Sequence, residues 1–217
     1  MNLCSKLSTL GAALVLTTAF ASADSLTIAS YATNNPDGIV ANNQATQYAG
    51  TSSTFAILQT GNPNTEWAAA LPGSEWVSYD AATGPEGNLT APAGTYTYTT
   101  TFDLTATNYT GILQVLADDT TDVWLNGHEI QLPAASGGDS HCQQYQPNCV
   151  TATSVLLDNY FVVGENTLTF NVQQTGGGAE GLDFSGSISQ TPEPSSLLLL
   201  GTGLIGSAGA LFRRMRA

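Results

Sequence analysis

The chain has 217 residues, with 17 acidic side chains against four basic ones and a formal net charge of −13. All four basic side chains lie near the termini, so the stretch from Asp24 to Gln190 holds 16 Asp and Glu and no Lys or Arg. Nucleic acids and anionic lipids are bound through cationic side chains, so both are poor partners for this stretch. It is long enough for one domain with its own core.

The first 23 residues have the three parts of a secretory signal peptide. Lys6 is the only basic side chain before an apolar run from Leu7 to Phe20. The run ends at Ala21-Ser22-Ala23, the small-x-small pattern at which such peptides are cut. We therefore expect a helical signal peptide over 1–23 and a mature chain that begins at Asp24. The alternative is a buried N-terminal helix.

Residues 24–190 have the composition of a β domain, rich in Thr, Tyr, Phe and Val. Apolar residues alternate with threonine or asparagine in 95–104 and 166–173, which predicts strands with one buried face. Residues 109–117 are more continuously apolar and predict a central strand covered on both faces. Further strands are expected at Leu26–Tyr31, Thr54–Gln59, Glu75–Tyr79 and Leu182–Ile188, with a polar loop over 34–50.

A hairpin is the strongest local signal of this domain. Residues 122–125 and 128–132 flank Asn126-Gly127, a pair that tolerates the positive φ angles of a type I′ turn. The run from Ala117 to Gly127, together with Phe161–Phe170, resembles the hairpin and a strand entry of galactose-binding-like jelly rolls. This resemblance covers residues 55–190 and implies an all-β fold, an antiparallel jelly-roll-like β-sandwich. It does not fix a ligand, because that fold serves many functions.

Three carboxylates near the hairpin, Asp118, Asp119 and Asp122, form a candidate calcium site, since Ca²⁺ prefers oxygen ligands. An EF-hand is excluded because Val123 stands where that loop requires glycine. The alternative is that Asp118 and Asp119 cap a tight turn and face water, and that the acidic composition serves solubility. No cofactor other than Ca²⁺ is suggested.

Two tryptophans, Trp76 and Trp124, are candidate glycan-binding residues, because an exposed indole ring stacks on sugar C–H groups. Trp124 alternates with Val123 and Leu125 and lies on the outer sheet face if those two face the core. If a second layer covers that face, Trp124 is a core residue instead. The sequence contains none of the common hydrolase or nucleotide-binding motifs, so we expect a protein that is not an enzyme.

Cys142 and Cys149 follow in a stretch rich in Gly, Gln and Pro. In an oxidising compartment a local disulfide between them is expected, and it should stabilise the domain by about 2.5 kcal/mol. The alternative is a metal site with His128 and His141, but the spacing matches no common zinc pattern.

The last residues, 191–217, read as a sorting signal in three parts. Pro192-Glu193-Pro194 precedes an uncharged segment, 195–212, and the basic end 213–217 carries Arg213, Arg214 and Arg216. Eighteen helical residues span roughly 27 Å, close to the apolar thickness of a bilayer, so 195–212 is predicted as a single transmembrane helix with a cytoplasmic basic end.

This arrangement resembles the PEP-CTERM sorting signal of Gram-negative bacteria. The resemblance implies processing by an exosortase, a membrane cysteine transpeptidase, and an exported protein that is anchored in the inner membrane before it reaches the cell surface. Its implied role is interaction with exopolysaccharide at the surface or in the extracellular matrix. Two alternatives remain open: an accessory module of a secreted glycan-active enzyme, and a purely structural surface protein.

Overall fold

The structure, a computed structural model, describes residues 24–34, 46–49, 53–57, 67–132, 147–191 and 194–215, with side chains from 200 onward in the last range. Several sites predicted from the sequence lie outside these residues: the signal peptide with Ala21 and Ala23, Cys142, His141, Pro192, Glu193 and Arg216.

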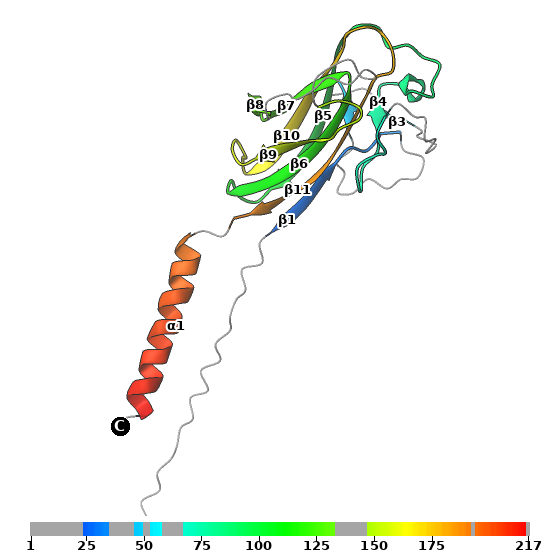
Figure 1. Ribbon diagram of the computed structural model, residues 1–217. Helices are drawn as coiled ribbons and strands as arrows, with labels where there is room; N and C mark the ends of the chain where they lie inside the picture. The colour runs from blue at the N-terminus through cyan, green and yellow to red at the C-terminus, as the bar shows by residue number, and fades with distance from the viewer. Residues whose placement is uncertain are drawn as a thin grey trace, which may run out of the picture.

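Two antiparallel sheets face each other and form a sandwich (Figure 1). The first has the order β3-β4-β11-β6-β9, with β1 also paired to β11. Its strands are β1 (Ser25–Ala29), β3 (Phe55–Ala56), β4 (Val77–Ser78), β6 (Tyr109–Asp118), β9 (Thr153–Leu157) and β11 (Gly181–Gln190). The second has the order β2-β5-β10-β7-β8. Its strands are β2 (Gln47–Tyr48), β5 (Gly94–Leu104), β7 (Thr120–Leu125), β8 (His128–Glu129) and β10 (Gly164–Gln174).

The chain crosses between the sheets repeatedly: β5, β7 and β10 lie in one sheet, whereas β6, β9 and β11 lie in the other. This alternation is the connectivity of a jelly roll, so the predicted antiparallel β-sandwich is confirmed. The hairpin is confirmed as well, with Asn126 at φ 51° and Gly127 at φ 78° between β7 and β8.

The main core lies between the sheets and is built by the period-two alternation of β5 and β10. Tyr98 and Phe170 are paired in the ladder and both are fully buried. Phe170 stacks on Phe184 of β11, with ring centroids 4.4 Å apart, and so joins the two sheets. Burying an aromatic side chain of this size stabilises a fold by about 2–3 kcal/mol.

A second, smaller core covers part of the outer face of the first sheet. Trp67 and Trp76 pack together with ring centroids 4.2 Å apart, over Leu116 of β6. Gly181 makes this close approach possible, because a Cβ at that position would lie 2.7 Å from the Trp67 ring. The sequence does not reveal this layer, because residues 67–76 are far along the chain from β6 and β11, which they cover.

The strand predictions need three corrections. Both β9 and β2 were missed: β9 is a five-residue strand paired with β6, and β2 lies inside the expected polar loop. β6 is not covered on both faces along its whole length, because the Ile112 side chain is 55% exposed. Only its end near Leu116 lies beneath the second core.

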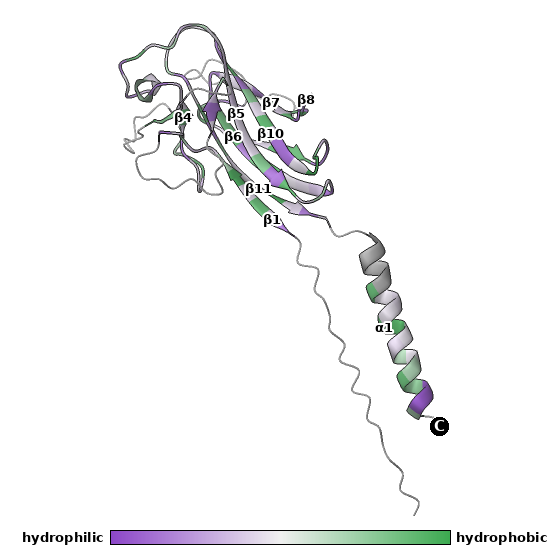
Figure 2. Ribbon diagram, turned by 180° about the vertical axis from the view of Figure 1, so that it is seen from behind, coloured by the Kyte–Doolittle hydropathy of each residue, from purple (hydrophilic) through white to green (hydrophobic). Residues whose placement is uncertain are grey.

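The C-terminal segment is helical, as expected, over α1 (Pro194–Met215), which extends away from the sandwich (Figure 1). Among the described residues, no helix is both long and apolar enough to cross a membrane, so the transmembrane helix predicted over 195–212 is not confirmed. Hydrophobic residues are spread along the coloured part of α1, and hydrophilic ones lie near its C-terminal end (Figure 2).

Candidate functional site: the outer face of the five-stranded sheet

The outer face of β5, β10 and β7 forms a continuous polar surface, which we call the polar face. Alternate residues of the three strands point away from the core, and all of them are partly or fully exposed. They are Thr95, Thr97, Thr99, Thr101, Asp103, Glu165, Thr167, Thr169, Asn171, Gln173, Thr120, Asp122 and Trp124.

Strand register orders these side chains into rows that run across the sheet. In one row Asp122, Asn171 and Thr97 are neighbours on successive strands. The Asn171 amide donates to Asp122 Oδ1 at 2.8 Å, and Thr97 Oγ1 donates to Asn171 Oδ1 at 2.9 Å. The next row places Trp124 beside Thr169, which is paired with Thr99. An indole ring therefore stands next to a line of hydroxyl and amide groups.

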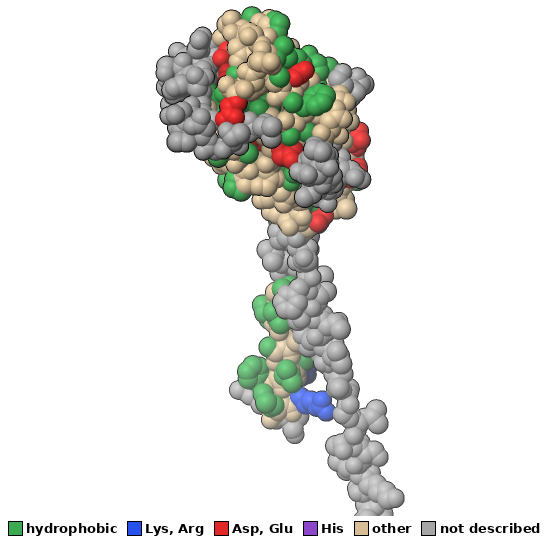
Figure 3. Space-filling model, turned by 90° about the vertical axis from the view of Figure 1, so that its right-hand side faces the viewer, with side chains coloured by type: hydrophobic (Ala, Val, Ile, Leu, Met, Phe, Trp, Pro, Cys, Tyr) green, Lys and Arg blue, Asp and Glu red, His purple; other side chains and the backbone are tan. Residues whose placement is uncertain are grey.

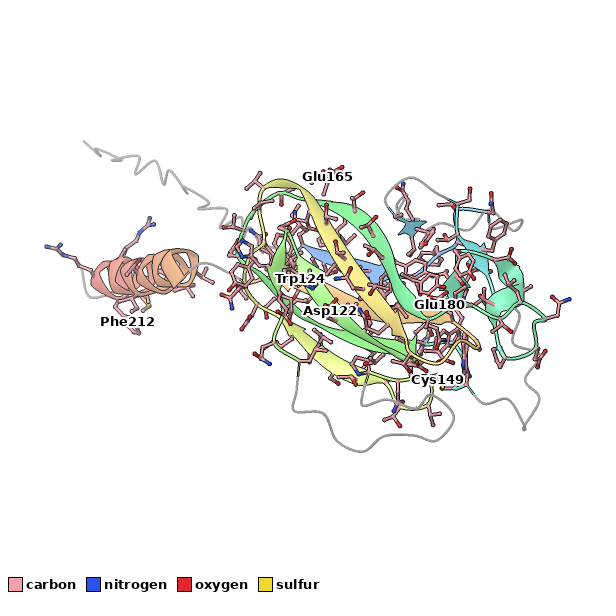
Figure 4. The ribbon with its side chains drawn as sticks, turned by 90° about the horizontal axis from the view of Figure 1, so that it is seen from above. Asp122, Trp124, Cys149, Glu165, Glu180 and Phe212 are labelled. Carbon is pink, nitrogen blue, oxygen red and sulfur yellow. The ribbon has the colours of Figure 1, made fainter. Side chains whose placement is uncertain are left out.

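Trp124 is the one tryptophan on this face. Its side chain is partly exposed, as the alternation with buried Val123 and Leu125 predicted. Figure 4 shows it beside Asp122 on the sheet, with Glu165 at the end of a strand. Among the described residues its Nε1 atom is buried without a hydrogen-bond partner, which costs free energy.

Trp76 does not belong to this site, so its glycan-binding prediction is wrong. Only 1% of its surface is exposed, and its Nε1 donates to the Ala68 carbonyl at 3.1 Å. Trp67 is also buried, at 4% exposed. Both rings belong to the second core, because the segment that carries them folds back over the first sheet.

Each of the three candidate calcium ligands accepts hydrogen bonds from protein donors. Asp118 Oδ2 accepts from Trp67 Nε1 at 2.6 Å, and Asp119 Oδ2 accepts from the Thr175 amide at 2.7 Å. Asp122 belongs to the polar face. In the described part of the chain, no three Asp, Glu, His or Cys side chains come together as a metal-binding group. A calcium site at these three residues stays a prediction.

Asp118 is buried: its side chain is 4% exposed, and desolvation raises its pKa to about 8. The turn-capping alternative placed Asp118 and Asp119 in water, and it is wrong for both, because Asp119 is 5% exposed. These carboxyl groups hold loops against the sandwich.

Two further buried carboxyl groups lie near the start of β11, and sequence reasoning missed both. Glu180 accepts from Ser78 Oγ at 2.6 Å and from the Tyr98 hydroxyl at 2.9 Å, and burial raises its pKa to about 7. Asp183 accepts from the Leu71 amide at 2.7 Å and from Ser30 Oγ at 3.0 Å, and burial raises its pKa too. Glu180 and Asp183 accept hydrogen bonds from hydroxyl and amide groups, not from cations, and so connect distant segments of the sandwich.

The remaining predicted site residues are placed as follows. Asp24, the expected first residue of the mature chain, lies against the end of β11, where its carbonyl accepts from the Gln190 amide at 2.8 Å. Pro194 begins α1, and Arg213 and Arg214 lie in its last turn. Cys149 is fully buried in the second core. Cys142 is outside the described residues, so the Cys142–Cys149 disulfide stays a prediction.

Comparison with known proteins gives one match to a family model. Residues 190–216 match the PEP-CTERM protein-sorting motif, so the chain carries this motif where the sequence predicted it. The motif implies export and a surface location. No curated protein matches the chain.

Solved structures with a similar arrangement include carbohydrate-binding modules. The family 35 module from Clostridium thermocellum shows 13% identity, covers 65% of this chain and 95% of that chain, and has a TM-score of 0.35. The family 35 module from Paenibacillus barcinonensis shows 14% identity, with coverages of 68% and 98% and a TM-score of 0.32. A Podospora anserina GH26-CBM35 β-(1,4)-mannanase shows 18% identity, coverages of 78% and 28%, and a TM-score of 0.35. The fold of this chain rests on its own strand pairing, described above.

Proposed function

We propose that the chain is an exported, non-catalytic cell-surface or extracellular-matrix protein whose polar face binds polysaccharide. Residues 1–23 direct export, and the motif at 190–216 delivers the chain to an exosortase-type membrane transpeptidase. The sandwich is the part that acts after sorting. The observation that carries the binding proposal is Trp124 beside the row of Asp122, Asn171 and Thr97.

The polar face has the two kinds of group that sugar recognition needs. The partly exposed Trp124 ring offers an apolar surface for sugar C–H groups. The neighbouring amide, carboxylate and hydroxyl groups offer acceptors and donors for sugar hydroxyls. Rows lie two residues apart along each strand, about 6.6 Å, so several units of an extended chain can contact several rows.

Charge narrows the ligand class to neutral or amine-bearing polysaccharide. Asp103 and Glu165 are direct cross-strand neighbours on the polar face, and Glu129 is paired with Trp124 at its edge. Between residues 24 and 190 the sequence has no Lys or Arg to offset them. On the side seen in Figure 3 the sandwich likewise shows acidic side chains, and basic ones occur on α1. Uronic-acid polymers would be repelled.

Affinity electrophoresis of the secreted protein through a panel of neutral, amine-bearing and uronic-acid polysaccharides tests the proposal. We expect retardation by at least one neutral or amine-bearing polymer, reduced at least tenfold in apparent affinity by Trp124→Ala. Leu156→Ala is the matched control, because that side chain is 54% exposed on the outer face of the other sheet. Retardation that Trp124→Ala leaves unchanged would contradict the polar-face site.

The same panel separates the alternatives. No retardation by any polymer would favour a purely structural surface protein, in which the Asp122–Asn171–Thr97 row only stabilises the sheet. Release of reducing sugars from a bound polymer would instead show a glycan-active enzyme.

A further inference from the structure

Both ends of the sandwich meet at one corner, beside the turn at 105–108 that joins β5 to β6. The Asp24 carbonyl accepts from the Gln190 amide at 2.8 Å, and Asp24 Oδ2 accepts from the Tyr109 hydroxyl at 2.9 Å. Tyr109 itself is 2% exposed and packs against Phe161. The first residue of the sandwich is thus tied both to its last strand and to a rigid core residue.

Asn108, next to Tyr109, binds the C-terminal end of the sandwich at Gln190 and Thr191. The Thr191 amide and the Thr191 hydroxyl donate to the Asn108 carbonyl at 2.7 Å and 2.8 Å. In return the Asn108 side-chain amide donates to the Thr191 carbonyl. The Gln190 side-chain amide donates to Asn108 Oδ1 at 3.2 Å. We call the residues Asp24, Asn108, Tyr109, Gln190 and Thr191 the corner clasp.

The corner clasp lies directly before the sorting motif, so it affects where a peptidase can cut the chain. A peptidase binds its substrate as an extended strand with free backbone groups on both sides of the bond that it cuts. Up to Thr191 those groups are already bonded to the sandwich, and α1 begins at Pro194. Cutting before Thr191 therefore requires local opening of the clasp first.

We propose that the corner clasp confines C-terminal processing to bonds after Thr191, with Asn108 as the positioning residue, and leaves Asp24–Thr191 as the mature domain. Cleavage of such a bond passes the new acyl end of the sandwich fragment to an acceptor: an amine gives a new amide, and water gives a carboxyl group. The α1 fragment leaves with a new amine. The cellular role of the clasp rests on the sorting function proposed above, but its protection of the backbone does not.

Limited digestion of the purified full chain by proteinase K, followed by intact-mass measurement, tests the protection directly. The wild-type limit fragment should end at or just beyond Thr191. In Asn108→Ala the two side-chain bonds are lost while the carbonyl remains, so cuts within 188–191 should appear about tenfold faster. Asn108→Asp, which keeps the Oδ1 acceptor, should fall between the two.

Asn159→Ala is the matched control, because its side chain bonds only its neighbour Asp158 among the contacts resolved in the described residues. If Asn108 acted merely on global stability, cuts would increase throughout the chain and the urea midpoint would fall. Wild-type limit fragments ending before Thr191, or identical cut positions and rates in Asn108→Ala, would overturn the proposal.

A second arm keeps the sorting proposal separate. The protein released by the producing cells should have a C-terminus at or after Thr191, and altering Pro192-Glu193-Pro194 should abolish release. Unimpaired release from the altered chain would contradict sorting through the motif. The proteinase K fragments of that chain would still decide whether the clasp protects the backbone.

Discussion

Glu180 should make the stability of the sandwich depend on pH above the acidic range. Its carboxyl group is fully buried against Tyr98 and Ser78, and desolvation raises its pKa from 4.5 to about 7. The folded state therefore favours the protonated form. The contribution to stability is fully present below pH 4.5 and is lost as the pH rises through 7.

The expected magnitude follows from the two pKa values. The difference between 4.5 and about 7, at about 1.4 kcal/mol per pH unit, corresponds to about 3 kcal/mol for Glu180. Asp118, whose pKa burial raises to about 8, adds a loss in the same direction. Glu180→Gln keeps the size of the side chain and removes its ionisation. The variant should therefore lose the pH-dependent destabilisation that comes from Glu180 and keep the one that comes from Asp118.

Urea unfolding of wild type and Glu180→Gln at pH 5 and pH 8 measures this. The urea slope is about 2 kcal/mol per molar. The urea midpoint of the variant minus that of wild type should therefore be about 1.5 M larger at pH 8 than at pH 5. Exposed Glu129→Gln is the control and should follow wild type. Equal pH dependence in wild type and Glu180→Gln would refute the assignment of the buried carboxyl.

Three further outcomes follow from the packing and the loops. Gly181→Ala should destabilise the domain by about 1–3 kcal/mol in the same urea assay, because the new methyl group meets the Trp67 ring; an unchanged midpoint would contradict the second core. Reduction of the secreted protein should add the mass of two hydrogens and lower stability by about 2.5 kcal/mol if Cys142 and Cys149 are joined; no mass change would exclude the disulfide. Millimolar Ca²⁺ should raise the melting temperature above its value in a chelator if Asp118, Asp119 and Asp122 bind the ion; no shift would exclude the calcium site.

Local patterns predicted the strands whose alternation is long and regular. β5 and β10 alternate over eleven residues each, so their buried and exposed faces were visible in the sequence. The Asn126-Gly127 turn was equally visible, since its backbone angles depend on the two residues themselves. β9 has only five residues and β2 only two, too few for a period to stand out.

The parts that could not be predicted depend on contacts between distant segments. Trp76 is buried because 67–76 folds over β6, and Asp118 is buried because Trp67, 51 positions earlier in the chain, donates to it. Glu180 is enclosed by Ser78 and Tyr98, from two other strands. Trp124 was predictable as an outward residue, but the neighbours Asn171 and Thr97 follow only from the strand register.

Tryptophan fluorescence during a polysaccharide titration tests polar-face binding most directly. Trp67 and Trp76 are buried, whereas Trp124 is partly exposed on the polar face, so a change in emission should arise from Trp124. We predict a saturable change with a neutral or amine-bearing polymer that disappears in Trp124→Phe, even where the variant still binds. A saturable change of the same size in Trp124→Phe would contradict binding at this face.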